Sequence, residues 1–90
     1  VEVLECWQLA IEQRQTPSAI ALSRQAITPV RQDDGTENLC AKGGYVVKGH
    51  SHQSQVGLIA TGSEVGLAVQ AYEKLKDIGI KSHVVSLPCW

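Results

Sequence analysis

The sequence predicts an α/β fold, made of parallel-sheet units with flanking helices and containing parts of two domains. Two observations support this fold class. A helical apolar pattern leads into a short apolar run, and further on a second helical pattern stands between two more such runs. A long stretch without periodicity separates the two groups, which is typical of a linker. We therefore expect residues 1–32 to end one domain, residues 33–37 to be the linker and residues 38–90 to begin the next domain.

The first segment has the apolar spacing of an amphipathic helix. Its apolar residues recur every three or four positions, at Val3, Leu4, Trp7, Ala10 and Ile11. Thr16-Pro17 predicts the end of the helix, because the residue before a proline disfavours helical geometry. We expect Trp7, which lies on this apolar face, to belong to a core rather than to a binding platform.

The run Ser18–Ser23 is short and apolar on both faces, which favours a buried parallel strand over a half-exposed antiparallel one. Beyond it, in residues 24–42, the periodic pattern gives way to turn-forming residues. We place the boundary between the two structural units near Asp33-Asp34-Gly35.

The second unit contains three short strand candidates and a helix. The candidates are Gly44–Lys48, Val56–Thr61 and His83–Leu87, and a polar loop, Gly49–Gln55, follows the first of them. The second candidate has the composition of a buried strand. Because the helix stands between the last two candidates, we expect a strand–helix–strand unit with a right-handed parallel crossover.

The helix of this second unit carries one apolar face. That face consists of Val65, Ala68, Val69, Tyr72 and Leu75. The N-cap is either Thr61, paired with Glu64 in a capping box, or Ser63. At the other end, Gly79 stands where a left-handed C-cap glycine is expected, followed by Ile80, which can pack against the last turn.

Composition and charge exclude several functional classes. Charged residues make up 19% of the chain and the formal net charge is -1, so we expect no nucleic-acid partner. No apolar run approaches the roughly 20 residues of a membrane helix, so we expect no membrane partner. The cysteines, at positions 6, 40 and 89, form no C-x-x-C pair for zinc or redox chemistry, which favours free thiols in an intracellular protein. Because the chain has no methionine, even at position 1, we expect it to be a fragment of a longer protein.

Arg24 is the strongest candidate for a ligand-binding residue. It follows the apolar run at 18–23, and open α/β sheets bind ligands beyond the carboxyl ends of their strands. A guanidinium at that position can hold a phosphate or a carboxylate through two hydrogen bonds. A surface arginine or a structural ion pair explains the same residue, so its position alone leaves the role of Arg24 open.

The remaining candidates are better explained by structure. The turn at 60–64 precedes a helix but matches neither G-x-G-x-x-G nor the P-loop, so we interpret it as a cap. His50 and His52 have no cysteine or carboxylate beside them at ligand spacing, so we expect an exposed loop and no metal site there. His83 enters a strand, where we expect a structural histidine with satisfied hydrogen bonds.

Five short motifs follow one another in the order and spacing of a known family. They are Glu5–Ala10, Leu22–Gln25, Lys42–Val46, Ile59–Val65 and Val84–Pro88, with the sequences ECWQLA, LSRQ, KGGYV, IATGSEV and VVSLP. In these motifs the chain resembles transketolase over nearly its whole length. The resemblance implies that residues 1–32 end the pyrimidine-binding domain of that family and that residues 38–90 begin its C-terminal domain.

The resemblance also implies an activity, the transfer of a two-carbon ketol (glycolaldehyde) unit from a ketose phosphate to an aldose phosphate. The implied cofactors are thiamine diphosphate and Mg (or Ca), and the implied partners are sugar phosphates and a second copy in a homodimer. The enzyme would be cytoplasmic and belong to the pentose phosphate pathway. Arg24 matches the arginine that binds the substrate phosphate in this family. The family's catalytic, cofactor-binding and metal-binding residues match no position here, so we expect the chain alone to be inactive.

Two other interpretations stay open. One is an autonomous, non-catalytic α/β interaction domain. The other is a fragment of a related thiamine enzyme, either a deoxyxylulose-phosphate synthase or a 2-oxo-acid dehydrogenase β subunit. The strings LSRQ and ATGSEV favour transketolase over both of these relatives.

Overall fold

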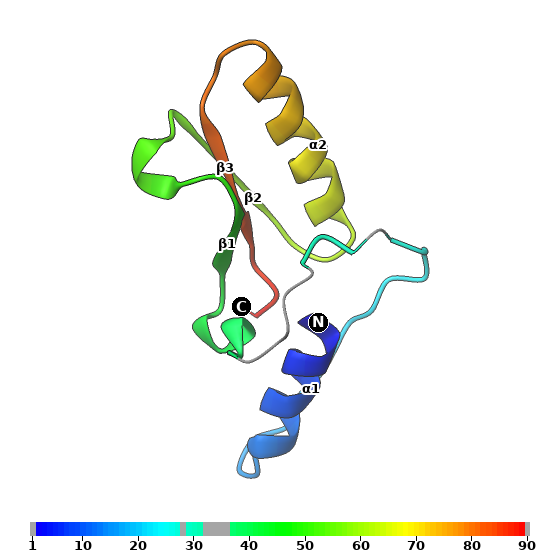
Figure 1. Cartoon of the computed structure of the whole chain (residues 1–90). Helices are drawn as coiled ribbons and strands as arrows, with labels where there is room; N and C mark the ends of the chain where they lie inside the picture. The colour runs from blue at the N-terminus through cyan, green and yellow to red at the C-terminus, as the bar shows by residue number, and fades with distance from the viewer. Residues whose placement is uncertain (1, 28, 32–36, 90) are drawn as a thin grey trace.

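The computed structural model describes residues 2–27, 29–31 and 37–89, which contain a three-stranded sheet, two α-helices and two short 3-10 helices. In chain order the elements are α1 (Glu2–Glu12), η1 (Leu39–Lys42), β1 (Tyr45–Lys48), η2 (Ser51–Gln53), β2 (Val56–Ala60), α2 (Glu64–Asp77) and β3 (Ser82–Ser86). Helix α2 runs alongside the sheet, whereas α1 lies beyond one end of it and contacts η1 (Figure 1). Between α1 and η1 the chain makes a long excursion, residues 13–31, that has no helix or strand among its described residues.

The sheet confirms the predicted strand–helix–strand unit. Strands β2 and β3 are parallel, with Val56 opposite Ser82 and Ala60 opposite Ser86, and α2 connects them. Strand β3 lies in the centre of the sheet, and β1 pairs with its other side in the antiparallel direction. The predicted α/β fold class is therefore confirmed, and β1 adds an antiparallel edge that the sequence pattern did not indicate.

We call the described residues 37–89, with their three strands, α2 and the two 3-10 helices, the sheet unit. The core of the sheet unit centres on β3. Val84 in the middle of this strand is fully buried, and Val65 of α2 and Tyr45 of β1 are buried as well. Alternate residues of a strand point to the same face, and Ser82 and Ser86 are accordingly buried on either side of Val84. Because two of these positions carry serine, the strand contributes little hydrophobic area to the core.

Helix α2 ends as the sequence predicts. Gly79 has a left-handed φ of 83°, its N–H donates to the Lys76 carbonyl (3.1 Å), and the Ile80 N–H donates to the Leu75 carbonyl (2.9 Å). These two bonds form a Schellman motif, so the predicted C-cap is confirmed. At the other end, Ser63 is the N-cap, but its backbone is already helical (φ -65°, ψ -16°) and its side chain forms no capping hydrogen bond.

Helix α1 forms where the sequence predicts a helix, but its apolar side chains are exposed. Leu4 is 75% exposed, Ile11 is 71% exposed, and Trp7 is 52% exposed, so the prediction that Trp7 belongs to a core is wrong. The residue of α1 that is buried is instead Glu5. The surface that α1 meets offers ionic and hydrogen-bonding partners, which is why a polar face of the helix turns inward.

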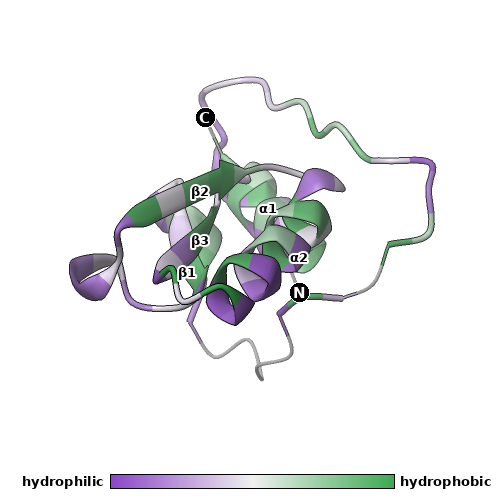
Figure 2. Ribbon diagram, turned by 90° about the horizontal axis from the view of Figure 1, so that it is seen from above, coloured by the Kyte–Doolittle hydropathy of each residue, from purple (hydrophilic) through white to green (hydrophobic). Residues whose placement is uncertain are grey.

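Two strand predictions need correction. The run Ser18–Ser23 forms no strand, because a strand needs a neighbour for its backbone N–H and C=O groups and none of the described strands pairs with this run. Strand β2 does form, but it is not the buried strand that we predicted. Figure 2 shows hydrophobic colour along β2, yet Ile59 is 70% exposed, because the described elements cover only one face of this edge strand.

The predicted boundary at 33–35 lies outside the described residues. Of the predicted linker, residues 33–37, the structure describes Glu37, whose carboxylate pairs with Lys42 at 3.1 Å on the surface. The division into residues 1–32, 33–37 and 38–90 therefore stays a prediction.

Candidate functional site

Arg24, the predicted phosphate-binding residue, lies in the excursion between α1 and Arg31. It is exposed and forms a bend with Gln25. Because the preceding run at 18–23 forms no strand, the expected position of Arg24 at a strand end is wrong for this structure. Its exposure is nevertheless the property that an anion-binding guanidinium needs.

The most organised polar cluster joins α1 to the sheet unit. At its centre, Oε2 of Glu5 lies 2.5 Å from Nη2 of Arg31, and neither side chain is more than 9% exposed. The other Glu5 oxygen accepts a hydrogen bond from the backbone N–H of Cys40 (3.1 Å). The Arg31 guanidinium also lies 5.1 Å from the centre of the Tyr45 ring. The buried charges are thus paired and hydrogen bonded, as a stable buried ion pair requires.

The cluster extends along one face of α1 in both directions. Towards the N-terminus, Glu2 accepts hydrogen bonds from the hydroxyls of Tyr45 and Ser86. Towards the C-terminus, Gln8 accepts a hydrogen bond from the Asn38 side-chain amide (3.0 Å), which also donates to a main-chain carbonyl of α1 (3.1 Å). These contacts recur at three-residue intervals, so one polar stripe of α1 faces the sheet unit.

The cluster shifts the pKa of several side chains away from neutrality. The hydrogen bond from Arg31 lowers the pKa of Glu5 from its ordinary value of 4.5 to about 2, although burial acts in the opposite direction. Burial raises the pKa of the Tyr45 hydroxyl. Burial, reinforced by the neighbouring Cys6, raises the pKa of the Cys40 thiol. General acid–base catalysis needs a pKa near the working pH, so this arrangement suits a structural role.

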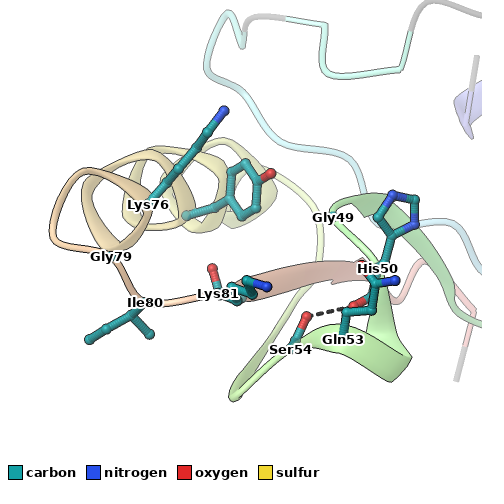
Figure 3. A pocket seen from close by; sticks show the side chains of 10 residues that line it. Gly49, His50, Gln53, Ser54, Lys76, Gly79, Ile80 and Lys81 are labelled. Atoms are coloured by element: carbon teal, nitrogen blue, oxygen red, sulfur yellow. Dashed lines mark hydrogen bonds between the residues drawn. The ribbon is translucent and has the colours of Figure 1, made fainter.

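A cavity of about 370 Å³ lies between η2 and the C-terminal end of α2. Figure 3 shows His50 and Ser54 on one side of it and Lys76 on the helix opposite, and Ser54 Oγ donates to the His50 carbonyl at 2.6 Å. Ser82 Oγ in its lining is buried and has no hydrogen-bond partner among the described residues. Arg24 is not one of the lining residues, so the cavity and the sequence-predicted site are separate.

The three histidines occupy positions in and beside the sheet unit. His50 precedes η2 and His52 lies within it, with ring centres 6.1 Å apart. His83 lies in β3 beside Gly57. A Cβ added to Gly57 would come 3.0 Å from Cε1 of the His83 imidazole. Its buried Nδ1 has no partner in the described part of the chain, so the expected satisfied histidine is wrong at this atom.

Across the residues that the structure describes, no group of three or more His, Cys, Asp or Glu side chains is placed to hold a metal ion. The described residues therefore do not fit a metal site. The helices of the described chain are also too short or too polar to cross a membrane.

Sequence reasoning missed the Glu5–Arg31 pair. The available signal was weak: two acidic residues, Glu2 and Glu5, in the first predicted helix, and an arginine in a stretch without periodicity. Residue spacing shows which side chains share a helix face, but it does not show which face meets a partner. The apolar face of α1 is therefore the one that the sequence predicts to be buried, whereas in the structure the polar face is the buried one.

Comparison with known proteins identifies the sheet unit. Residues 43–90 match the family model described as the transketolase-like TK C-terminal domain. The chain belongs to the transketolase C-terminal domain family. The matched residues include α2 and every strand that the structure describes.

Curated transketolases match nearly the whole chain. The transketolase of Sinorhizobium medicae (strain WSM419) is 45% identical over 91 residues, which covers 100% of this chain and 13% of that protein. Transketolase 1 of Escherichia coli (strain K12) is 43% identical over 88 residues, which covers 98% of this chain and 13% of that protein. The chain thus spans 13% of the length of these relatives, and the predicted resemblance to transketolase is confirmed.

Solved transketolase structures share the fold. The transketolase from Leishmania mexicana has a TM-score of 0.82 and 34% identity, and the match covers 98% of this chain and 12% of that one. A Pichia stipitis transketolase in complex with sedoheptulose-7-phosphate has a TM-score of 0.79 and 40% identity, with 97% and 12% coverage. Because nearly all of the chain is matched, the similarity extends beyond the sheet unit to α1 and the excursion.

Proposed function

We propose that this chain is part of a transketolase that transfers a two-carbon ketol (glycolaldehyde) unit from a ketose phosphate to an aldose phosphate. The observation that carries the proposal is 45% identity to a curated transketolase along the whole chain. Since the chain spans 13% of that relative, the complete reaction would need the rest of such a protein.

Thiamine diphosphate and Mg (or Ca) would be held by residues outside this chain. This assignment rests on the resemblance to transketolase, in which the residues that hold the cofactor and the metal match no position of this chain. The bound thiamine would supply the carbanion chemistry, and the protein would supply positioning. We place the enzyme in the cytoplasm and in the pentose phosphate pathway, and we propose that it acts as a homodimer.

Arg24 is proposed to bind the phosphate group of the sugar substrate. Its exposed guanidinium is accessible to an anion, and the matching Pichia stipitis structures include complexes with xylulose-5-phosphate and sedoheptulose-7-phosphate. A phosphate lies at the far end of a sugar phosphate from the reacting carbonyl. Binding energy from that remote group would orient the carbonyl for reaction.

The test uses Escherichia coli transketolase 1 in which the aligned segment is replaced by this chain. The unmutated hybrid should transfer ketol units, and an inactive but folded hybrid would contradict the proposed function. In the active hybrid, Arg24→Ala should raise the KM for a phosphorylated ketose by roughly 10- to 100-fold, because a hydrogen bond to a charged group contributes about 1.5–3 kcal/mol. The KM for an unphosphorylated ketose should hardly change.

The matched control is Arg14→Ala, since Arg14 is also an exposed arginine of the excursion. This variant should leave both KM values unchanged. Arg24→Lys keeps the charge but loses the two-pronged geometry, so its KM should lie between those of the unmutated hybrid and Arg24→Ala. Equal increases for phosphorylated and unphosphorylated donors in Arg24→Ala would refute the phosphate-binding role.

A further inference from the structure

Two of the three free cysteines lie on opposite sides of the junction between α1 and the sheet unit. Cys6 belongs to α1 and is half-buried, whereas Cys40 belongs to η1 and is fully buried. Cys89, near the other end of the chain, is exposed. The two junction cysteines thus differ in their access to solvent.

The contacts of Cys40 place it against the first turns of α1. Its Sγ lies 3.8 Å from the backbone carbonyl oxygen of Glu2, and its backbone N–H donates to the Glu5 carboxylate at 3.1 Å. Residues four apart in a helix share a face, so Cys6 lies one turn beyond Glu2 on the side that Cys40 contacts. The effect of Cys6 on the pKa of the Cys40 thiol agrees with this placement.

The environments of these two thiols suit successive steps of disulfide exchange. The thiolate is the nucleophile in such exchange, and an accessible thiol reacts first. Of the two junction thiols, Cys6 is the one that a dissolved reagent can reach. Cys40 is shielded by burial, which also raises the pKa of its thiol, so it is not itself the first point of attack.

We propose that Cys6 and Cys40 form a covalent modification site, at which a low-molecular-weight disulfide such as oxidised glutathione generates an intramolecular cross-link between α1 and η1. This inference concerns residues outside the proposed phosphate site and does not depend on it.

The reaction proceeds in two exchanges. The Cys6 thiolate attacks one sulfur of oxidised glutathione, so a mixed disulfide forms, the S–S bond of the reagent breaks and glutathione leaves as a thiolate that takes up a proton. The Cys40 thiol then loses its proton and attacks the Cys6 sulfur, which forms the Cys6–Cys40 bond and releases the second glutathione. In total, the two cysteines are oxidised by two electrons and one oxidised glutathione is reduced to two glutathione thiols.

The cross-link is detected by peptide mapping of the full chain. Trypsin cleaves after Arg14, Arg31, Lys42 and Lys81, so the cysteines fall in separate peptides, at 1–14, 32–42 and 82–90. The chain is incubated with oxidised glutathione, its remaining thiols are alkylated in denaturant, and the digest is examined without reduction by mass spectrometry. The expected product is peptide 1–14 joined to peptide 32–42, two hydrogens lighter than the sum of the free peptides.

Three single variants test the assignment. Cys89→Ser should keep the link, because Cys89 takes no part in it. Cys40→Ser should trap glutathione on Cys6, and Cys6→Ser should leave Cys40 unmodified in the folded chain. The proposal is overturned if glutathione stays on Cys6 of the unmutated chain while Cys40 remains a thiol, or if the main links involve peptide 82–90.

A second measurement tests whether the cross-link fits the folded chain. A disulfide that fits the native structure stabilises it by restricting the unfolded chain. In the Cys89→Ser variant, oxidation should therefore move the urea unfolding midpoint to a higher concentration, and dithiothreitol should reverse the shift. A midpoint that falls on oxidation would show that the two residues are too far apart in the folded state and would also overturn the proposal.

Discussion

The carboxylate of Glu5 lies 2.5 Å from the guanidinium of Arg31, and this buried pair joins α1 to the end of the excursion. The pair is supported on both sides, by the backbone N–H of Cys40 on the carboxylate and by the Tyr45 ring next to the guanidinium. Its stability follows from these neighbours, because an isolated buried charge is strongly unfavourable.

Replacing Glu5 should destabilise the chain. Glu5→Gln removes the negative charge that lies 2.5 Å from the buried Arg31 guanidinium, for which we expect a loss of about 3 kcal/mol in the free energy of unfolding. Urea unfolding followed by circular dichroism measures this loss. Glu12→Gln is the matched control in the same helix, since Glu12 is exposed and bonds only the Gln8 amide among the contacts described (3.1 Å). Similar losses in both variants would contradict a special role for Glu5.

The stabilising effect of Glu5 should depend on pH. Its folded-state pKa of about 2 lies below the ordinary 4.5, so as the pH falls the unfolded chain takes up this proton before the folded one does. The contribution of Glu5 is therefore fully present above its ordinary pKa and is lost progressively as the pH falls from about 4.5 towards 2. The difference in unfolding free energy between the unmutated chain and Glu5→Gln should shrink over this range. A constant difference across it would exclude the pKa shift.

Two glycines in and next to α2 should respond in opposite directions to alanine. Gly79 has a φ of 83°, so Gly79→Ala strains the Schellman motif and should destabilise the chain by about 1 kcal/mol. Gly66 lies inside the helix, where an added Cβ would meet no atom within 4 Å, so Gly66→Ala should stabilise by roughly 0.5–1 kcal/mol. Thermal melting of both variants tests this, and shifts of the same sign would contradict the structure.

The core role of β3 can be tested at Val84. Val84→Ala removes two methyl groups from a fully buried position and should lower the unfolding free energy by about 2 kcal/mol. Val46→Ala in β1 makes the same chemical change at a side chain that is 43% exposed, so its effect should be much smaller. Urea unfolding compares the two variants. Equal effects would mean that the centre of the core lies elsewhere.

The features that the sequence predicted correctly are local ones. Helix α2 and the C-cap at Gly79 depend on residues within one or two turns of each other. The strands on either side of this helix follow from the same short-range pattern, because a helix between two apolar runs is typical of a parallel pair. Local signals of this kind predict an element correctly because they do not depend on how the rest of the chain packs.

The features that the sequence did not predict depend on which surfaces meet. The burial of Glu5 needs Arg31 and Cys40 as partners, and neither residue lies near it in the sequence. The run Ser18–Ser23 has strand composition, but pairing partners rather than composition decide whether a strand forms. The role of Arg24 also depends on a ligand, and so it remains a prediction for the substrate-binding experiment to test.

The excursion begins at the end of α1 that lies farther from the sheet, and it returns at Arg31, which pairs with Glu5 near the beginning of the same helix (Figure 1). The entropy lost on closing a flexible loop grows slowly with length, by about 0.6 kcal/mol for each doubling. Lengthening or shortening the chain between residues 13 and 30 should therefore change the stability of the sheet unit very little. Insertions or deletions in this segment can thus move Arg24 relative to the sheet unit while leaving the sheet unit itself unchanged.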